Sequence, residues 1–393
     1  MENEEKKEYQ IQRELNIRKI IIIGIVVLLI IAVIVVFSLY IAEDGFRKWV
    51  DTNLLRKDIT SENVATIDLN VDKNNQIFCY SKYVCILNEK NLKLYNQSGE
   101  NVTDISVNIN TATFCSNDKY LAIAEKNGQE LCVITDKVYS WGQKVDGEIL
   151  QIYINKNGYV VLVTTDTTYK SIITVYDNNG KQIMRSFLAS TRVTDVAMSN
   201  DNKYMAYAEI DTSGTLIQSN IKIISIEKAQ TENGDATIYT KEGELSKMIV
   251  KLQYQEKGEL VCVYNDSVNI IKENQENEII QKDDEITFVS GNLNNSIAYI
   301  REEQKGVFDS NSTLNIINTS SKQTYTYKFE EISKEMYTNG NVIGINIGTE
   351  LYLVNTNGML IKKYTSNQEI TNVMISNDLA IIIYKDRIEI INL

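Results

Sequence analysis

Short runs of β-forming residues, separated by turns rich in Asn, Asp and Gly, restrict the fold of this chain more than any other feature. One unit contains four such runs, at residues 149–154 (ILQIYI), 159–165 (YVVLVTT), 171–176 (SIITVY) and 181–187 (KQIMRSF). Two of the turns end in Asn-Gly, and these residues tolerate the positive φ angles of tight hairpins. The unit therefore predicts a four-stranded antiparallel sheet.

The unit repeats along the chain. Residues 261–271 (VCVYNDSVNII) align without a gap with residues 381–391 (IIIYKDRIEII), 120 positions later. Two turn sequences also recur. The first is SNDKYLA at 116–122, SNDNKYMA at 199–206 and SNDLA at 376–380, and the second is NQSGE at 96–100, DNNGK at 177–181 and NTNGM at 355–359.

A four-stranded unit about every 40–50 residues is typical of a β-propeller blade. The predicted fold class is all-β, a β-propeller of eight blades preceded by a single transmembrane α-helix; seven blades remain the alternative if one weak unit is an insertion. The last unit has room for three strands, so residues 63–70 (NVATIDLN) are predicted to supply its fourth and close the ring. The predicted blades start near Gln76, Thr111, Ile149, Thr194, Lys247, Ile286, Ile332 and Ile370.

Residues 20–41 form an apolar segment of 22 residues without a charge. A helix of that length rises about 33 Å, enough to cross a hydrocarbon core of about 30 Å. The alternative is a cleaved signal peptide, whose apolar region is shorter and ends in a small-x-small site. Tyr40 occupies a position where that site needs a small residue. We therefore predict an uncleaved transmembrane helix over residues 20–42, with the lipid bilayer as its partner.

The flanking charges predict the orientation. Arg18 and Lys19 precede the apolar segment and Glu43 and Asp44 follow it, although further basic residues lie beyond. Because positive charge stays on the cytoplasmic side, we predict a single-pass cell-membrane protein with its N-terminus cytoplasmic and its C-terminal domain extracytoplasmic. The predicted domains are a cytoplasmic tail (1–19), a transmembrane helix (20–42), an amphipathic stalk (43–60) and an extracytoplasmic propeller (61–393).

The predicted stalk has apolar residues at helical spacing, namely Phe46, Trp49, Val50 and Leu54. Trp favours the membrane–water interface, which fits a helix lying at the membrane surface. A helix packed on the following domain explains the same pattern equally well. Both interpretations stay open from the sequence.

Composition excludes several functions. The chain contains no His, which rules out Ser-His-Asp or Cys-His catalysis and His-ligated zinc or haem. Its net charge of −12 lies after the apolar segment, since residues 1–19 carry five acidic and five basic side chains. An acidic domain of this kind argues against nucleic acid as a partner.

Five cysteines occur without a CxxC spacing, at Cys79, Cys85, Cys115, Cys132 and Cys262, so metal-binding and thioredoxin-like motifs are absent. Cys79 and Cys85 flank a possible hairpin turn around Lys82 and could face each other across it as a disulfide. The alternative is that all five are small buried apolar residues.

No motif indicates a catalytic, cofactor-binding or metal-binding residue, and we predict no cofactor. The SND turns lack the Gly and Trp of a sialidase Asp box. Asp177-Asn178-Asn179-Gly180 has its Gly too early for a calcium loop and no closing acid. The cluster Asp283-Asp284-Glu285 is interpreted as a solvated loop rather than a cation site.

The SNDKYLA and DNNGK sequences resemble the degenerate repeats of bacterial WD-repeat-like and quinoprotein-like propellers. With the preceding apolar segment, the chain resembles a family of unknown function, membrane-anchored β-propellers from clostridial Firmicutes. The resemblance covers nearly the whole chain after residue 19. Its motifs are strands and turns, so it implies architecture and location rather than an activity.

The predicted function is therefore a non-catalytic, membrane-anchored binding or scaffold propeller of the cell envelope that contacts a protein partner. Two alternatives remain. One is an envelope glycan-binding or glycan-cleaving protein that uses carboxylates, which acidic side chains converging in the central channel would favour. The other is a ligand sensor that signals through the membrane anchor.

Overall fold

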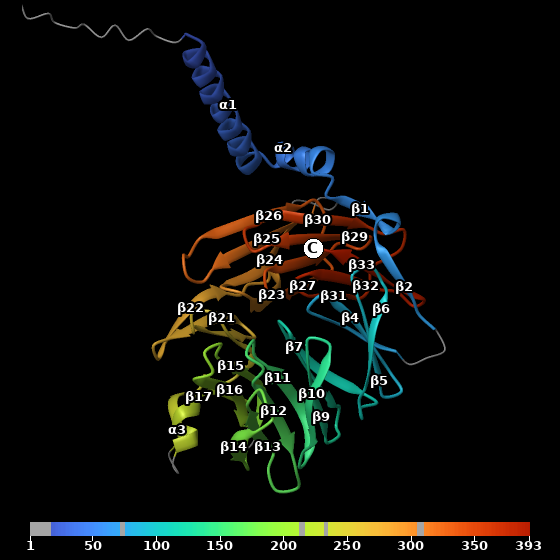
Figure 1. Ribbon diagram of the computed structural model, residues 1–393. Coiled ribbons are helices and arrows are strands. Elements are labelled where there is room, and N and C mark those ends of the chain that lie inside the picture. The colour runs from blue at the N-terminus through green and yellow to red at the C-terminus, as the bar shows by residue number, and fades with distance from the viewer. Residues whose placement is uncertain (1–16, 71–74, 212–216, 232–234, 305–309) are drawn as a thin grey trace, which may run out of the picture. The chain divides into compact units, whose positions relative to one another are not determined.

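Eight antiparallel sheets account for nearly all strands in the described part of the chain, and they surround a common axis (Figure 1). The computed structural model describes residues 17–70, 75–211, 217–231, 235–304 and 310–393. Innermost strands of neighbouring sheets contact one another around the ring, including the last with the first. The eight-bladed propeller predicted from the repeat is thus confirmed.

Blades 1 to 4 follow one another along the chain, each running from its innermost to its outermost strand. Blade 1 comprises β3 (Gln76–Tyr80), β4 (Tyr83–Asn88), β5 (Asn91–Tyr95) and β6 (Asn101–Ser106). Blade 2 comprises β7 (Ala112–Asn117), β8 (Tyr120–Glu125), β9 (Glu130–Thr135) and β10 (Val138–Lys144). Blade 3 comprises β11 (Glu148–Ile154), β12 (Val160–Thr165), β13 (Ser171–Tyr176) and β14 (Gln182–Leu188). Blade 4 comprises β15 (Arg192–Met198), β16 (Tyr204–Asp211), β17 (Gln218–Ser225) and β18 (Thr237–Lys241), with helix α3 (Ile226–Thr231) inserted before β18.

Blades 5 to 8 continue the ring, and the last two also take strands from the start of the domain. Blade 5 comprises β19 (Ile249–Tyr254), β20 (Leu260–Tyr264), β21 (Ser267–Lys272) and β22 (Gln275–Gln281). Blade 6 comprises β23 (Ile286–Leu293), β24 (Ser296–Gln304), β25 (Ser310–Asn318) and β26 (Thr324–Phe329). Blade 7 comprises β27 (Glu335–Asn339), β28 (Val342–Asn346), β29 (Glu350–Asn355), β30 (Leu360–Thr365) and β1 (Asp58–Thr60). Blade 8 comprises β31 (Val373–Ile375), β32 (Leu379–Ile383), β33 (Arg387–Asn392) and β2 (Ala65–Asp68).

Strand β2 closes the ring as predicted, because it is the fourth strand of blade 8 and pairs antiparallel with β33 (Figure 1). The side chain of Ile67 is buried among residues of blades 8 and 1, including Ile388 and Val84. The first and last parts of the propeller are thereby joined within one sheet. Strand β1, which adds a fifth strand to blade 7, was not predicted.

Continuous apolar runs form the middle strands because both faces of each blade are covered by its neighbours. In β12, Val160 and Leu162 pack in the cluster shared with blade 2, while Val161 and Val163 pack in the cluster shared with blade 4. Successive residues of a strand point to opposite faces, so a strand covered on both faces is apolar at every position. The core of the molecule is accordingly a series of interfaces between adjacent blades.

A buried serine at the start of the third strand links each of three blades to the next one. Ser171, Ser219 and Ser312 are fully buried. Their Oγ atoms accept hydrogen bonds from the backbone N–H groups of Val193 (3.0 Å), Ile249 (3.2 Å) and Ser333 (2.9 Å), respectively. These serines were not predicted as a recurrent feature from the sequence.

The two recurrent turn sequences are strand-connecting turns, as predicted. In the hairpin between β13 and β14, Asp177 Oδ1 accepts hydrogen bonds from the backbone N–H groups of Asn179 and Lys181, both at 2.9 Å. Gly180 has a φ of +81°, and a Cβ atom there would lie 2.7 Å from the ring of Trp141. This position needs glycine for both its backbone angle and its contact with blade 2.

Cys79 and Cys85 do not form a disulfide, and all five cysteines are free thiols. Cys79 pairs with Val84 and Cys85 pairs with Phe78 in the hairpin of β3 and β4. The two side chains therefore lie on opposite faces of blade 1, and they pack in different hydrophobic clusters. Cys85 lies six residues after Cys79, and the turn between the two strands has two residues. The cysteines are therefore displaced by one position in the strand pairing, so their side chains point to opposite faces and cannot form a bridge.

The segment before the propeller is a separate compact unit that ends at Asp58. Helix α1 spans Ile17–Ala42, and its part from Ile21 to Ala42 is exposed, apolar and long enough to cross a membrane. Helix α2 (Asp44–Trp49) and the π-helix η1 (Val50–Leu54) follow. Asp51 Oδ1 accepts a hydrogen bond from the Tyr40 hydroxyl (2.7 Å) and lies 2.7 Å from Lys57 Nζ, which ties the end of α1 to the residues after it. A short 3₁₀ turn, η2 (Ser61–Asn63), joins β1 to β2.

Candidate functional site

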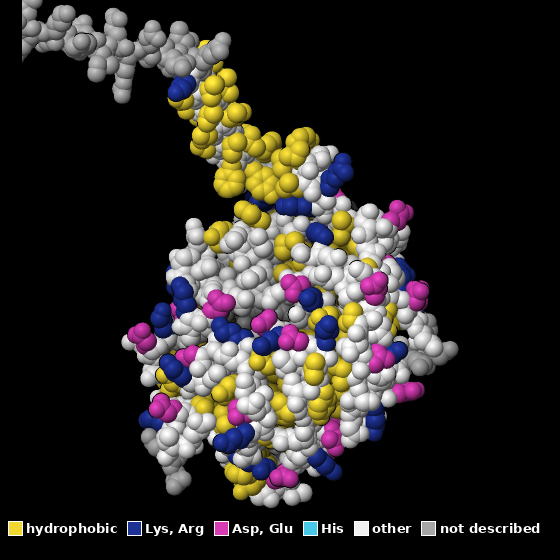
Figure 2. Space-filling view, viewed as in Figure 1, with side chains coloured by type: hydrophobic (Ala, Val, Ile, Leu, Met, Phe, Trp, Pro, Cys, Tyr) yellow, Lys and Arg dark blue, Asp and Glu magenta, His cyan; other side chains and the backbone are white. Residues whose placement is uncertain are grey.

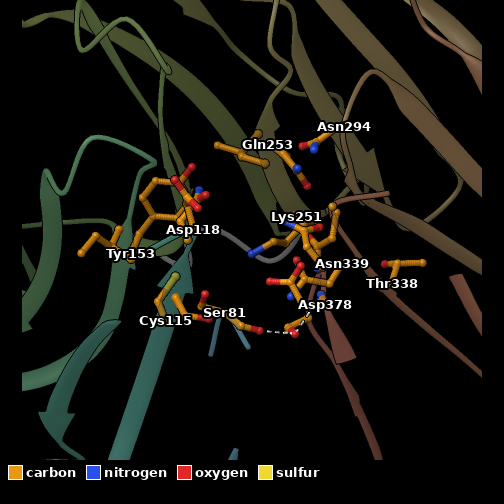
Figure 3. Close-up of a pocket in the computed structure, with 18 residues that line it drawn as sticks. Ser81, Cys115, Asp118, Tyr153, Lys251, Gln253, Asn294, Thr338, Asn339 and Asp378 are labelled. Atoms are coloured by element: carbon orange, nitrogen blue, oxygen red, sulfur yellow. Dashed lines mark hydrogen bonds between the residues drawn. The ribbon is translucent and has the colours of Figure 1, made fainter. Parts of the chain in front are cut away.

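The candidate site is a polar cavity of about 270 Å³ on the propeller axis, which we call the axial cavity (Figure 3). Its walls come from innermost strands and from the turns that follow them, in seven of the eight blades. Most lining side chains are amides or hydroxyls. The lining residues are Ser81, Cys115, Ser116, Asn117, Asp118, Tyr153, Ile154, Lys251, Leu252, Gln253, Asn292, Asn294, Thr338, Asn339, Gly340, Ser376, Asn377 and Asp378.

β-Bulges in the innermost strands of four consecutive blades, 3 to 6, help to shape this axis. Each bulge lies one or two residues after the first paired residue of its strand, at Leu150, Thr194, Val250 and Thr287. An extra residue shifts the following side chain to the other face of the strand. The bulges therefore set the direction of Gln151, Asp195 and Lys251, which follow them directly.

These redirected side chains link blades 3, 4 and 5. Gln151 Nε2 donates to the carbonyl of Thr194 at 2.7 Å, and Asp195 Oδ2 accepts from the backbone N–H of Leu252 at 2.7 Å. Lys251 Nζ lies 3.4 Å from Asp195 Oδ2. Figure 3 shows the Lys251 side chain extending toward the middle of the cavity. The ammonium of the cavity is therefore paired with a largely buried carboxylate.

Burial raises the pKa of Asp195, and the neighbouring Lys251 ammonium and the Leu252 N–H oppose this rise without cancelling it. Because its pKa is higher in the folded than in the unfolded chain, protonation of Asp195 favours folding. That contribution is complete below the unfolded value of about 3.9 and is lost as the pH rises through the folded value.

We expect the wild-type chain to gain stability relative to an Asp195→Asn variant as the pH falls from 7 to 4. Asp201→Asn serves as the control, because the wild-type chain should instead lose stability relative to this variant as the pH falls. Partial burial acts on Asp201 too, but hydrogen bonds from Ser199 Oγ and the Lys203 N–H outweigh it and lower its pKa. Urea midpoints measured at several pH values test this prediction, and parallel profiles for wild type and Asp195→Asn would contradict it.

Several amide side chains of the cavity have unused hydrogen-bonding capacity. Among the described residues, the side chains of Asn117, Gln253 and Asn294 make no hydrogen bond to protein, and Gln253 Oε1 is buried. These three side chains are half-buried and come from blades 2, 5 and 6. Asn339 differs, because its Nδ2 donates to the carbonyl of Ile375 at 2.8 Å and so joins blades 7 and 8. Unpaired amides at one cavity are the chemical signature of a site that binds polar groups.

Two carboxylates lie at the exposed edge of the cavity. Asp118 and Asp378 belong to the SND turns of blades 2 and 8, and both are exposed. The SND sequences are turns, as predicted from the sequence. That two of the three turns line a cavity depends on their position around the ring, which the sequence does not show.

The acidic cluster after β22 is an ion-pair network with Arg301. Arg301 Nη2 lies 2.9 Å from Asp283 Oδ2, and Arg301 Nη1 lies 2.5 Å from Glu285 Oε2. Within the described ranges, no group of three or more Cys, Asp or Glu side chains is arranged to hold a metal ion.

The comparisons with known proteins agree with this architecture. The C-terminal WD40 domain of Sif2 has 9% identity and a TM-score of 0.55, with 84% of this chain and 99% of that chain covered. BamB from Moraxella catarrhalis has 12% identity and a TM-score of 0.48, with 84% and 99% covered. At 9% identity, the similarity to the Sif2 domain shows only the fold. No curated protein matches the sequence. The model of DUF5711, a family of unknown function, matches residues 56–393, and the chain therefore belongs to this family.

Proposed function

We propose that this chain is a non-catalytic, single-pass membrane protein whose propeller binds a protein partner outside the cytoplasm. The axial cavity carries the non-catalytic part of the proposal. Its side chains donate and accept hydrogen bonds, and its one ammonium is paired with Asp195. The two carboxylates of its lining, Asp118 and Asp378, are both exposed, whereas carboxyl groups that act as general acids are typically shielded from water.

Apolar side chains on the outermost strands of blades 2 and 3 support a protein partner. Val138 on β10 is 66% exposed and Phe187 on β14 is 53% exposed. Figure 2 shows hydrophobic side chains at the surface of this part of the propeller. Outermost strands also present unpaired backbone groups, with which an extended segment of another protein can pair.

The apolar helix and its flanks support the membrane location. The helix from Ile21 to Ala42 can span a bilayer, Lys19 precedes it and Glu43 follows it. The positive-inside rule then directs the propeller away from the cytoplasm. Protease treatment of intact cells should remove a C-terminal tag, and protection of that tag would contradict this orientation. The clostridial origin implied by the resemblance stays a prediction.

Crosslinking in intact cells tests the protein-binding role. The tagged full-length chain should recover a defined envelope protein that a matched variant ending at residue 60 does not. A Val138→Glu, Phe187→Glu double variant should reduce recovery of that protein, because it places charge on the proposed contact strands. Equal recovery with and without residues 61–393 would overturn the proposal.

We also expect Trp49 to lie at the membrane interface. Trp49 is 56% exposed and its ring stacks against Phe46 at a centroid distance of 6.3 Å. Leu54 and Leu55 of the same unit are exposed as well. In bilayers that contain brominated lipids, the full-length chain should show strong tryptophan quenching.

Trp49→Phe provides the control, since Trp141 in blade 2 is then the only remaining tryptophan. This variant should lose nearly all of the lipid-dependent quenching. Equal tryptophan fluorescence of the wild-type chain in brominated and unbrominated bilayers would favour the alternative in which the stalk is kept away from the lipid.

A further inference from the structure

We propose that the axial cavity is a binding site for a neutral, polyhydroxylated ligand, that is, a carbohydrate unit. This inference is independent of the proposed protein contact, which involves outer strands. It rests on the free amides of the cavity, its charge balance, its size and the half-buried ring of Tyr153.

The free amides define the hydrogen bonds that a ligand must make. The side chains of Asn117 and Asn294 each present a carbonyl acceptor and an NH₂ donor, whereas Gln253 presents its NH₂ donor because its Oε1 is buried; in the described structure none of the three side chains bonds to protein. In Figure 3, Gln253 and Asn294 lie on the same side of the view, while Tyr153 lies on the other. A hydroxyl group both donates and accepts, so a polyol matches planar amides in either orientation.

The charges argue against an anionic ligand. Lys251, the cation of the cavity lining, is 3.4 Å from Asp195 and so is already paired. Asp118 and Asp378 add negative charge at the exposed edge, which repels phosphate or carboxylate ligands. Their oxygens still accept hydrogen bonds from hydroxyl groups. The lining therefore favours neutral donors over anions.

The cavity has the size and the mixed surface that a sugar ring requires. A volume of about 270 Å³ corresponds to about nine water molecules at about 30 Å³ each. This lies at the small end of ligand pockets, which favours one or two rings over an extended polymer. The half-buried Tyr153 supplies apolar surface within the polar lining, against which the C–H face of a ring can pack.

Binding is tested with the full-length protein in a detergent without a sugar head group, because glycoside detergents would compete. Glucose, galactose, mannose, N-acetylglucosamine and inositol are titrated by calorimetry, with glycine amide and inorganic phosphate as non-carbohydrate probes. At least one sugar should bind saturably, with phosphate not binding.

Cys115 gives a second readout at the same place. It lines the cavity and is half-buried, whereas the other four cysteines are buried. A sugar in the cavity should slow the modification of Cys115 by a small thiol reagent, located by peptide mass spectrometry. Binding without protection would place the sugar elsewhere and overturn the assignment to this cavity.

Matched variants locate the interaction. Gln253→Leu and Asn294→Leu should each weaken sugar binding about tenfold or more, since each removes polar contacts of the bound hydroxyls. Asn277→Leu is the control, because Asn277 is exposed on β22, the outermost strand of the same blade as Gln253. If a leucine variant does not fold, Gln253→Glu and Asn294→Asp keep the side-chain size and should also change the affinity.

Three results would overturn the inference. The first is that none of the four sugars and inositol binds saturably. The second is that phosphate or glycine amide binds more tightly than every one of these polyols. The third is that wild type, Gln253→Leu and Asn294→Leu bind the same polyol with equal affinity. None of these results bears on partner recovery by crosslinking, so the inference can fail while the proposed protein-binding function stands. Conversely, loss of crosslinking with intact sugar binding would overturn the protein-binding function while the carbohydrate site stands.

Discussion

Replacing Ile67 by Ala is expected to lower the free energy of unfolding by about 2–5 kcal/mol. Ile67 is the buried residue of β2, is 6% exposed and packs against the last and first blades. Removing three buried carbon atoms there leaves a cavity at the junction where the two ends of the ring meet. Urea denaturation of the full chain in detergent, followed by circular dichroism of the sheets, measures the change.

Thr66→Ala is the control for Ile67. Thr66 is exposed on the same strand and pairs with Glu389 through backbone groups, so its replacement should change stability by less than about 0.5 kcal/mol. In the Ile67→Ala variant, hydrogen exchange in β33 should also increase relative to wild type by more than it does in blade 4. A loss below about 1 kcal/mol would show that closure by β2 contributes little to stability.

The second large effect is expected at Asn155, where Ala should cost about 2–4 kcal/mol. Asn155 is fully buried at the turn after β11. Its Oδ1 accepts hydrogen bonds from the backbone N–H groups of Asn157 and Tyr159, both at 3.0 Å. Its Nδ2 donates to Ser199 O (3.1 Å) and Asn202 Oδ1 (2.6 Å) of blade 4. Alanine removes these four hydrogen bonds at a blade interface and takes away the acceptor of the Asn157 and Tyr159 N–H groups.

Asn355→Ala isolates the contribution of the turn. Asn355 Oδ1 accepts the equivalent two hydrogen bonds within its own turn, from Asn357 and Met359, both at 3.0 Å. Within the described part of the chain its side chain makes no hydrogen bond to a neighbouring blade, so alanine there should cost about 1 kcal/mol. The difference between the two variants measures the bonds between blades 3 and 4, and equal losses at both positions would contradict that interpretation.

Local patterns account for the parts of the fold that the sequence predicted. The predicted blade starts differ from the observed ones by three residues at most, as at Ile370 and Val373. Strand alternation and Asn-Gly turns depend on the backbone preferences of a few adjacent residues, which is why they can be read from one sequence. Closure by residues 63–70 followed from counting strands, since an open sheet edge is unfavourable.

The features of the axial cavity had no comparable signal. Lys251 and Asp195 are 56 residues apart and meet because bulges of neighbouring innermost strands redirect both side chains. Asn117, Gln253 and Asn294 look like ordinary turn and strand residues in the sequence. Only the ring brings residues of blades 2, 5 and 6 to one axis.

The same distinction explains the disulfide alternative. The sequence placed Cys79 and Cys85 on either side of a turn, but the pairing register decided which face each side chain occupies. A shift of one residue in a strand reverses the direction of its side chains, and the register depends on packing against the adjacent blades.

The sequence alone determined that this chain has an apolar helix followed by repeated four-stranded units, because period and turn chemistry are local properties. The tertiary structure decided which polar side chains share the axial cavity, which serines link adjacent blades, and where β1 and β2 join the ring. These arrangements join residues that are distant in the chain, and closing the ring fixes their positions relative to one another.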